Sequence, residues 1–237
     1  MKQTVVVFTY LLLLFGLSSC LFSPSIKGNG NVVEQARHLD TFDELKVSRG
    51  MNVYITQGNE TKVVVIADEN LHEVIETTVT DQRLEIKSTS NIRSATENKV
   101  LLTVPQLELI KAIAGCNVYS EGILKGKEME ISAAAGSNVH LSVELAHAIV
   151  SASAGSNINM DGTANHFFAK AAAGANIKAN SVVSNLTEAK VSSGANIWVN
   201  SKEELKANAS SGGNIFFIGN PPITEFHKSS GGNVIKN

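Results

Sequence analysis

From residue 109 onward, apolar and polar residues alternate on either side of a recurring corner of the form glycine, any residue, asparagine, then valine or isoleucine. Positions five, three and one before the glycine are apolar or small, as in Ile131, Ala133 and Ala135, and the position four before it is polar. Positions three and five after it are mostly apolar, as in Val139 and Leu141. Alternation with a period of two predicts a strand on each side of the corner. A helix would need apolar residues at spacings of three and four, and the glycines would weaken it.

The corner recurs at nearly constant intervals from Gly115 to Gly231, and one earlier copy, at Gly50, stands well apart from the others. A repeat of about 20 residues predicts stacked units, none of which can bury its apolar face alone. The corner residues are Gly50, Asn52, Gly115, Asn117, Gly136, Asn138, Gly155, Asn157, Gly174, Asn176, Gly194, Asn196, Gly212, Asn214, Gly231 and Asn233.

These corners predict an all-β protein, a thin, flattened parallel β-solenoid with two or three short strands per coil. Glycine and asparagine enter left-handed backbone conformations most readily, which a sharp corner requires. Asparagines at equivalent places are expected to form a ladder of side-chain amides from coil to coil. Small residues three and one before each glycine are expected to face inward, where the two walls approach closely.

Residues 29–108 carry a less regular version of the same pattern. Leu45, Val47, Val53 and Ile55 reproduce the apolar positions around Gly50. Residues 62–67 predict a buried strand, 88–98 a polar loop, and 70–79 either a short helix or an extended stretch. Because no linker marks a boundary, we expect a single solenoid domain over 29–237, with irregular coils in 29–108 and regular repeats in 109–237.

The segment 1–20 predicts a signal peptide rather than part of the fold. A short positive segment precedes an apolar run of about 13 residues, which is too short to span a bilayer as a permanent helix. The following Leu-Ser-Ser-Cys resembles a bacterial lipobox and predicts a lipid on Cys20, a tether over 21–28 and an outer-membrane lipoprotein. An ordinary secretory signal is the alternative.

Two stretches together with the corners resemble a known family. Residues 42–58 read FDELKVSRGMNVYITQG and residues 79–86 read VTDQRLEI. With the Gly-x-Asn-Ile corners, they are similar to the autotransporter-adhesin "head GIN domain" family, over about residues 29–237. The resemblance implies a parallel β-helix-like fold and a role in adhesion or cell-envelope structure.

Composition and motifs favour a binding protein over an enzyme. The formal net charge is −2 and aromatic residues make up 5% of the chain, so no nucleic-acid partner is expected. No catalytic motif occurs, the histidines follow no metal-ligand spacing, and no cofactor is predicted. Glu128 and Glu130 are the candidate carboxylates for the alternative, a polysaccharide lyase or hydrolase of the β-helix type. A periplasmic envelope scaffold is the other alternative.

Three further features bear on partners. Position four after the glycine should point outward, which makes Trp198, Phe216 and Ile235 a candidate patch for a glycan or protein ligand, unless the corner or residues 221–222 cover them. Cys116 is interpreted as a small corner residue, with an exposed oxidisable thiol as the alternative. No capping helix follows the last predicted strand, so we expect either a cap formed by residues 221–222 and their neighbours or self-association through the solenoid end.

Overall fold

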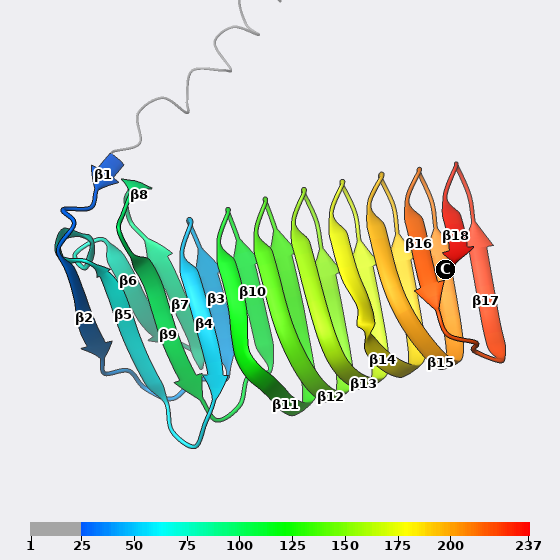
Figure 1. Ribbon diagram of the computed structural model, residues 1–237, viewed down its shortest axis with the longest axis horizontal. Coiled ribbons are helices and arrows are strands. Elements are labelled where there is room, and N and C mark those ends of the chain that lie inside the picture. The colour runs from blue at the N-terminus through cyan, green and yellow to red at the C-terminus, as the bar shows by residue number, and fades with distance from the viewer. Residues whose placement is uncertain (1–24) are drawn as a thin grey trace, which may run out of the picture.

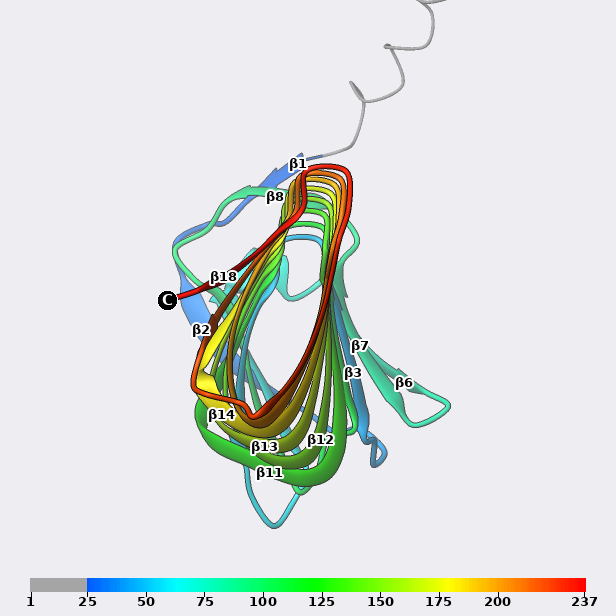
Figure 2. The same cartoon turned by 90° about the vertical axis from the view of Figure 1, so that its right-hand side faces the viewer.

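The solenoid predicted from the repeats is the fold of the chain. The computed structural model describes residues 25–237. It is an elongated stack of parallel coils with one row of tight corners along a long edge, at the top of Figure 1. Viewed along the stack, each coil is flattened into two walls that meet at the corner and at an opposite bend (Figure 2). The predicted signal peptide, Cys20 and the first part of the predicted tether lie outside the described residues.

Each regular coil is one long bent strand, so the expectation of two or three short strands per coil is wrong. These strands are β11 (Asn117–Ala134), β12 (Asn138–Ala152), β13 (Asn157–Ala171), β14 (Asn176–Val191) and β15 (Asn196–Ala209). Burial alternates along β12 until Ala146 and His147, two successive residues that both escape burial and mark the bend. The parallel ladder continues through the bend, for example with His147 opposite His166, and therefore keeps the strand continuous.

The coils stack in register at the corners. Asn138 pairs with Asn157, and Asn157 with Asn176. Register shifts occur lower on the strands, as between Ala179 and Val183, so the differences in repeat length are absorbed away from the corners. The stack continues with β16 (Asn214–Ile218), β17 (Ile223–Lys228), which pairs with β15, and β18 (Asn233–Lys236), which pairs with β16.

The core is a narrow interior of aliphatic and small residues, and the corner sends a different small residue inward than expected. Ala133 is buried, as predicted, but Ala135 is exposed, whereas Ser137 is fully buried. The reason is that Ala135 and Gly136 both adopt left-handed conformations, with φ of 51° and 73°. Two such residues in succession turn the side chain before the glycine outward and the one after it inward.

The N-terminal part mixes coils with antiparallel strands. β3 (Glu44–Ser48) and β4 (Asn52–Gln57) form a coil that lies between two others: β7 (Arg83–Ser88) and β9 (Asn98–Val104) on one side, β10 (Leu109–Ile113) and β11 on the other. The coil prediction is wrong for β2 (Val32–Arg37), β5 (Lys62–Asp68) and β6 (Ile75–Thr80), which pair antiparallel. A short 3-10 turn (Glu69–Leu71) precedes β6.

A separate two-stranded sheet lies near the N-terminal end of the stack (Figure 1). β1 (Ser25–Lys27) pairs with β8 (Asn91–Ser94), so the end of the predicted tether and the middle of the predicted polar loop are both strands. The buried carboxylate of Asp68 accepts backbone hydrogen bonds from Gly30, Thr96 and Glu97 at 3.0, 3.1 and 3.1 Å. Burial alone would raise the pKa of Asp68. The hydrogen bonds from these donors together lower it by more, so the pKa lies below its usual value. Asp68 therefore ties the chain before β2 to the segment after β8.

Candidate binding surface

One outward-facing row of side chains runs along the stack from β4 to β18, with one residue from each coil on the way. Parallel pairing places each member directly beside the next. We call it the axial row, and its members are Tyr54, Tyr119, His140, Asn159, Lys178, Trp198, Phe216 and Ile235. Three of these form the patch predicted from the sequence, and the structure brings them together as neighbours near the C-terminal end.

Aromatic rings stack along both ends of the axial row. Ring centroids are 5.1 Å apart for Tyr54 and Tyr119, and 5.3 Å apart for Tyr119 and His140. Trp198 and Phe216 stack at 5.1 Å with an interplanar angle of 12°, and the Lys178 ammonium lies 5.9 Å from the Trp198 ring centroid. The Trp198 and Phe216 side chains are both half-buried.

Between the two aromatic stacks the axial row is polar and borders a groove. This polar groove has a volume of about 410 Å³ and runs across β11 to β14. Its polar lining residues are Tyr119, Ser120, His140, Ser142, Asn159, Asp161, Lys178, Asn180 and Ser181. A hydrogen bond of 2.9 Å from the Ser142 hydroxyl to the Asp161 carboxylate joins two of them.

The polar groove offers hydrogen-bond donors and acceptors in a line with aromatic groups at both ends. Asn159 lies 3.4 Å from a ring nitrogen of His140, so the amide and the imidazole are linked across two coils. Such a surface is suited to a ligand rich in hydroxyl groups. Sequence reasoning missed Ser142 and Asp161, which belong to a second outward row two positions beyond the axial row; continuing the alternation by one step would have found them.

The corner asparagines form the predicted ladder, at the edge next to the axial row. The side-chain amide of each asparagine from Asn117 to Asn233 donates to the amide oxygen of the asparagine one coil before it, at 2.8–3.1 Å. The corner glycines have φ near 70°. These residues are therefore linked to one another and hold the edge of the stack.

The wall opposite the axial row carries the glutamates that are candidates for catalysis. Glu128 and Glu130 are exposed on one outward face of β11, on either side of the buried Met129. Further along, Lys206 lies in register between Glu188 and Glu225, and its ammonium is 2.9 Å from Glu204. The hydrogen bond from Lys206 to Glu204 and the surrounding negative charge raise the pKa of Lys206.

Two of these glutamates border a small groove. Its volume is about 200 Å³, and Glu188 and Glu204 line it with His166 and Phe168. Glu188 is also ion-paired, at 2.6 Å from the Lys190 ammonium. Glu188 and Lys206 stand six positions before their corner glycines, and His166 and Glu204 stand eight before theirs. Sequence reasoning missed this cluster because it followed the pattern only five positions back from each glycine.

Cys116 is a buried corner residue, and the alternative of an exposed thiol is wrong. Its thiol donates to the Val47 carbonyl at 3.3 Å and lies 3.5 Å from the Ser137 hydroxyl. Burial raises the pKa of the Cys116 thiol, because the thiolate would lose its hydration.

The last strands of the stack leave an edge of the sheet unpaired within the described residues. β17 and β18 are each paired on one side only within residues 25–237, and Ile223 on β17 and Ile235 on β18 are 58% and 41% exposed. Over the same residues, no group of three or more His, Cys, Asp or Glu side chains is arranged to hold a metal ion. The described part of the chain also contains no helix that is long and apolar enough to cross a membrane.

Solved structures share the fold at low sequence identity. An adhesin described as "putative" from Bacteroides fragilis superposes with a TM-score of 0.83 at 22% identity, covering 90% of this chain and 99% of its own. A "putative lipid binding protein" from Parabacteroides distasonis gives 0.75 at 21% identity, covering 90% and 99%. A "putative adhesin" from Parabacteroides merdae gives 0.71 at 20% identity, covering 91% and 100%. No curated protein matches the chain.

The family comparison agrees with the resemblance seen in the sequence. The family described as "Putative auto-transporter adhesin, head GIN domain" matches residues 41–221. The matched segment begins just before β3 and ends between β16 and β17, so it includes the whole polar groove and nearly all corners. The chain belongs to the head GIN domain family of adhesin-like proteins.

Proposed function

We propose that the chain is a non-catalytic binding protein of the bacterial cell envelope, an adhesin that binds an extended glycan along the axial row and the polar groove. A lipid on Cys20 would hold it to the outer membrane. Family membership supports the adhesin role. The observation that carries the glycan proposal is the polar groove, in which imidazole, amide, ammonium and hydroxyl groups follow one another between two aromatic stacks.

The geometry of the row favours a polymer over a small molecule. Adjacent parallel strands are separated by about 4.8 Å, so the row presents one side chain at that interval along the stack. A ligand with repeated hydroxyl groups can contact successive coils in the same way, whereas a small ligand would use two or three coils and leave the rest unoccupied. A protein ligand is the other candidate occupant.

The test compares two lysines on opposite walls of neighbouring strands. Lys178 lines the polar groove, while Lys170 is exposed on β13 four positions before the corner glycine, on the other wall. Binding of the purified protein to immobilised envelope polysaccharides should fall at least about tenfold in K178A and stay unchanged in K170A, since one well-placed charged contact is worth about 1.5–3 kcal/mol. N159A should lose less, because a neutral hydrogen bond contributes about 0.5–1.5 kcal/mol. Equal binding by all variants would refute the role of the groove.

The aromatic end of the row needs a separate variant. Replacing Trp198 and Phe216 with serine removes the stacked pair and should weaken binding of the longest glycans most, since these reach the C-terminal coils. Thermal unfolding of the double variant checks that the fold survives. If short and long glycans lose affinity equally, the ligand does not extend along the row.

Anchoring and orientation are tested in cells. Replacing Cys20 with serine should release the protein from the membrane fraction if the cysteine carries the lipid. Protease treatment of intact cells, with a periplasmic protein as control, should remove it if it faces outward. Protection from the protease would exclude the adhesin role and favour a periplasmic scaffold.

A glycan-cleaving enzyme is the second candidate, because Glu188 and Glu204 share a groove with His166 and Phe168. Incubating the same polysaccharides with the protein and measuring new reducing ends distinguishes the two functions. Cleavage that disappears in E188Q and E204Q would replace the binding proposal with an enzymatic one. Self-association through the C-terminal strands remains a separate proposal, tested by sedimentation over a range of protein concentrations.

A further inference from the structure

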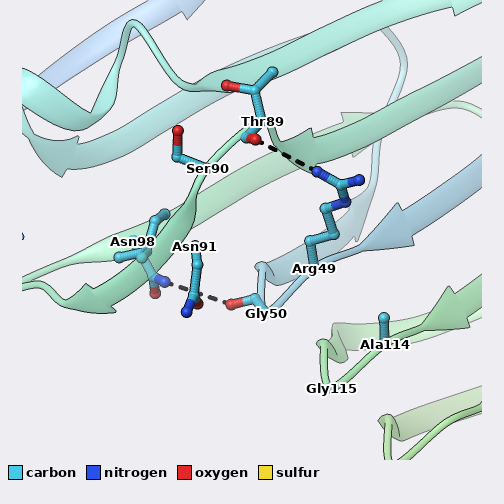
Figure 3. Close-up of a pocket in the computed structure, with 9 residues that line it drawn as sticks. Arg49, Gly50, Thr89, Ser90, Asn91, Asn98, Ala114 and Gly115 are labelled. Carbon is cyan, nitrogen blue, oxygen red and sulfur yellow. Dashed lines mark hydrogen bonds between the residues drawn. The ribbon is translucent and has the colours of Figure 1, made fainter. Parts of the chain in front are cut away.

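A second pocket lies at the N-terminal end of the corner edge and shares no residue with the polar groove. Its volume is about 560 Å³. The corner of the β3–β4 coil forms one side with Arg49 and Gly50, and the segment leading into β8 forms the other with Thr89, Ser90 and Asn91 (Figure 3). Asn98 and the next corner, at residues 114–115, complete it.

Arg49 is much larger than the residues at the same position in the other corners, and it is charged. It directly precedes the corner glycine and has a left-handed backbone with φ of 57°. At this position every other Gly-x-Asn corner carries a small residue with φ of 46–58°. Those residues are Ala114, Ala135, Ala154, Ala173, Ser193, Ser211 and Ser230. Since alanine or serine is sufficient to form the corner, the corner itself does not require a long cationic side chain here.

The guanidinium of Arg49 is held in place but not neutralised. Its Nη1 donates to the carbonyl oxygens of Ser88 and Thr89, at 3.3 and 3.4 Å. Within residues 25–237, no carboxylate forms an ion pair with it, in contrast to Arg83, which is ion-paired with Glu44. A guanidinium has five N–H donors in a planar fork, so donors remain for a planar or tetrahedral anion.

The opposite side of the pocket supplies neutral polar groups on a fixed segment. The amide of Asn98 reaches back to the Gly50 carbonyl at 3.4 Å, which links the two sides (Figure 3). Asn91 is exposed at the start of β8, which is paired with β1. Beyond β8 the chain is tied down by the buried Asp68 carboxylate. The pocket walls are therefore set by the fold before any ligand arrives.

We propose that this pocket binds an acidic sugar, with Arg49 holding its carboxylate or phosphate and the Ser90, Asn91 and Asn98 side of the pocket facing its hydroxyl groups. The pocket volume lies within the range of about 300–1,000 Å³ that is usual for small-molecule sites. A cation without a counterion selects for a negative charge, and the surrounding amides and hydroxyl groups favour a polyhydroxylated ligand over a bare ion.

The test uses the full chain and three defined probes at low ionic strength. Glucuronic acid, glucose 6-phosphate and glucose are titrated by calorimetry, with inorganic phosphate as a fourth probe. At least one acidic sugar should bind about tenfold or more tightly than glucose and inorganic phosphate. Whichever acidic sugar binds more tightly identifies the anion as a carboxylate or a phosphate. Equal binding of glucose and the acidic sugars, or of phosphate alone, overturns the proposal.

Variants then assign the binding to the pocket. R49Q should lose at least about tenfold in affinity, and R49K, which keeps the charge but not the fork, should lose less. R93Q is the matched control, because Arg93 is an exposed arginine on β8 that does not line the pocket. If R49Q is unstable, R49K and R93Q still separate the fork from general charge. Loss of binding in K178A but not in R49Q would assign the sugar to the polar groove instead. Since the pocket is separate, failure here leaves the proposed glycan-binding function of the groove standing.

Discussion

Removing one asparagine from the middle of the corner ladder should destabilise the solenoid by about 2 kcal/mol, because two side-chain hydrogen bonds are lost at once. The Asn157 amide donates to Asn138 at 3.1 Å, and its oxygen accepts from Asn176 at 3.0 Å. Asn157→Ala breaks both bonds and leaves the partly buried Asn138 amide oxygen and Asn176 amide N–H without this partner. A typical buried side-chain hydrogen bond contributes about 1 kcal/mol net, and an unsatisfied partner adds to the loss.

The same substitution at the end of the ladder provides the comparison. Asn233 is exposed and donates to only one ladder neighbour, Asn214, at 2.9 Å. Asn233→Ala should therefore cost about 0.5 kcal/mol, and it should act on the last coil without weakening the rest.

Urea unfolding followed by circular dichroism measures both free energies of unfolding by linear extrapolation. Hydrogen exchange of the terminal amides shows whether the loss at Asn233 stays local. Equal losses in the two variants, or a loss below about 0.5 kcal/mol for Asn157→Ala, would show that the ladder contributes little and that backbone pairing alone holds the corners.

Three further predictions concern buried groups and glycines. Because the pKa of Asp68 is lowered in the folded chain, its stabilisation is present above its unfolded pKa of about 4 and is lost as the pH falls through the folded value, so acid unfolding should be steeper in the wild type than in Asp68→Asn. Cys116 should react with a thiol reagent only after unfolding, since it is buried with a raised pKa; rapid labelling of the native chain would contradict its burial. Gly162→Ala should cost more than about 2 kcal/mol by urea unfolding, since its φ is 114° and a Cβ would clash with the Val143 carbonyl. Gly174→Ala, with φ of 69° and open space, should cost about 1 kcal/mol, and equal costs would refute the clash.

The regular part of the fold was predictable because one short motif, Gly-x-Asn followed by valine or isoleucine, indicates both the corner and the register. Glycine and asparagine at a nearly constant spacing indicate where each coil turns, and the alternation beyond them indicates which side chains face out, including Trp198 and Phe216. The direction of the residue before each glycine was not predictable from alternation, because two left-handed residues such as Ala135 and Gly136 reverse it.

The N-terminal end and the sites were less accessible to sequence reasoning. Antiparallel pairing of β5 with β9 joins residues with no shared spacing, such as Val65 and Val100. The pocket around Arg49 depends on a segment that comes from a distant part of the chain, at Thr89. Contacts of this kind arise from the order in which strands pack, and a repeat pattern does not contain that information.

The in-register stacking of the coils also relates the length of the molecule to its reach. Each coil contacts mainly its two neighbours, so whole coils between β11 and β15 could be gained or lost without altering the antiparallel strands at the other end. Every added coil would move the last one outward by about 4.8 Å, the separation of paired strands. The number of repeats thus determines the length of the stack. A change in that number changes how far from its N-terminal end this protein presents a binding surface.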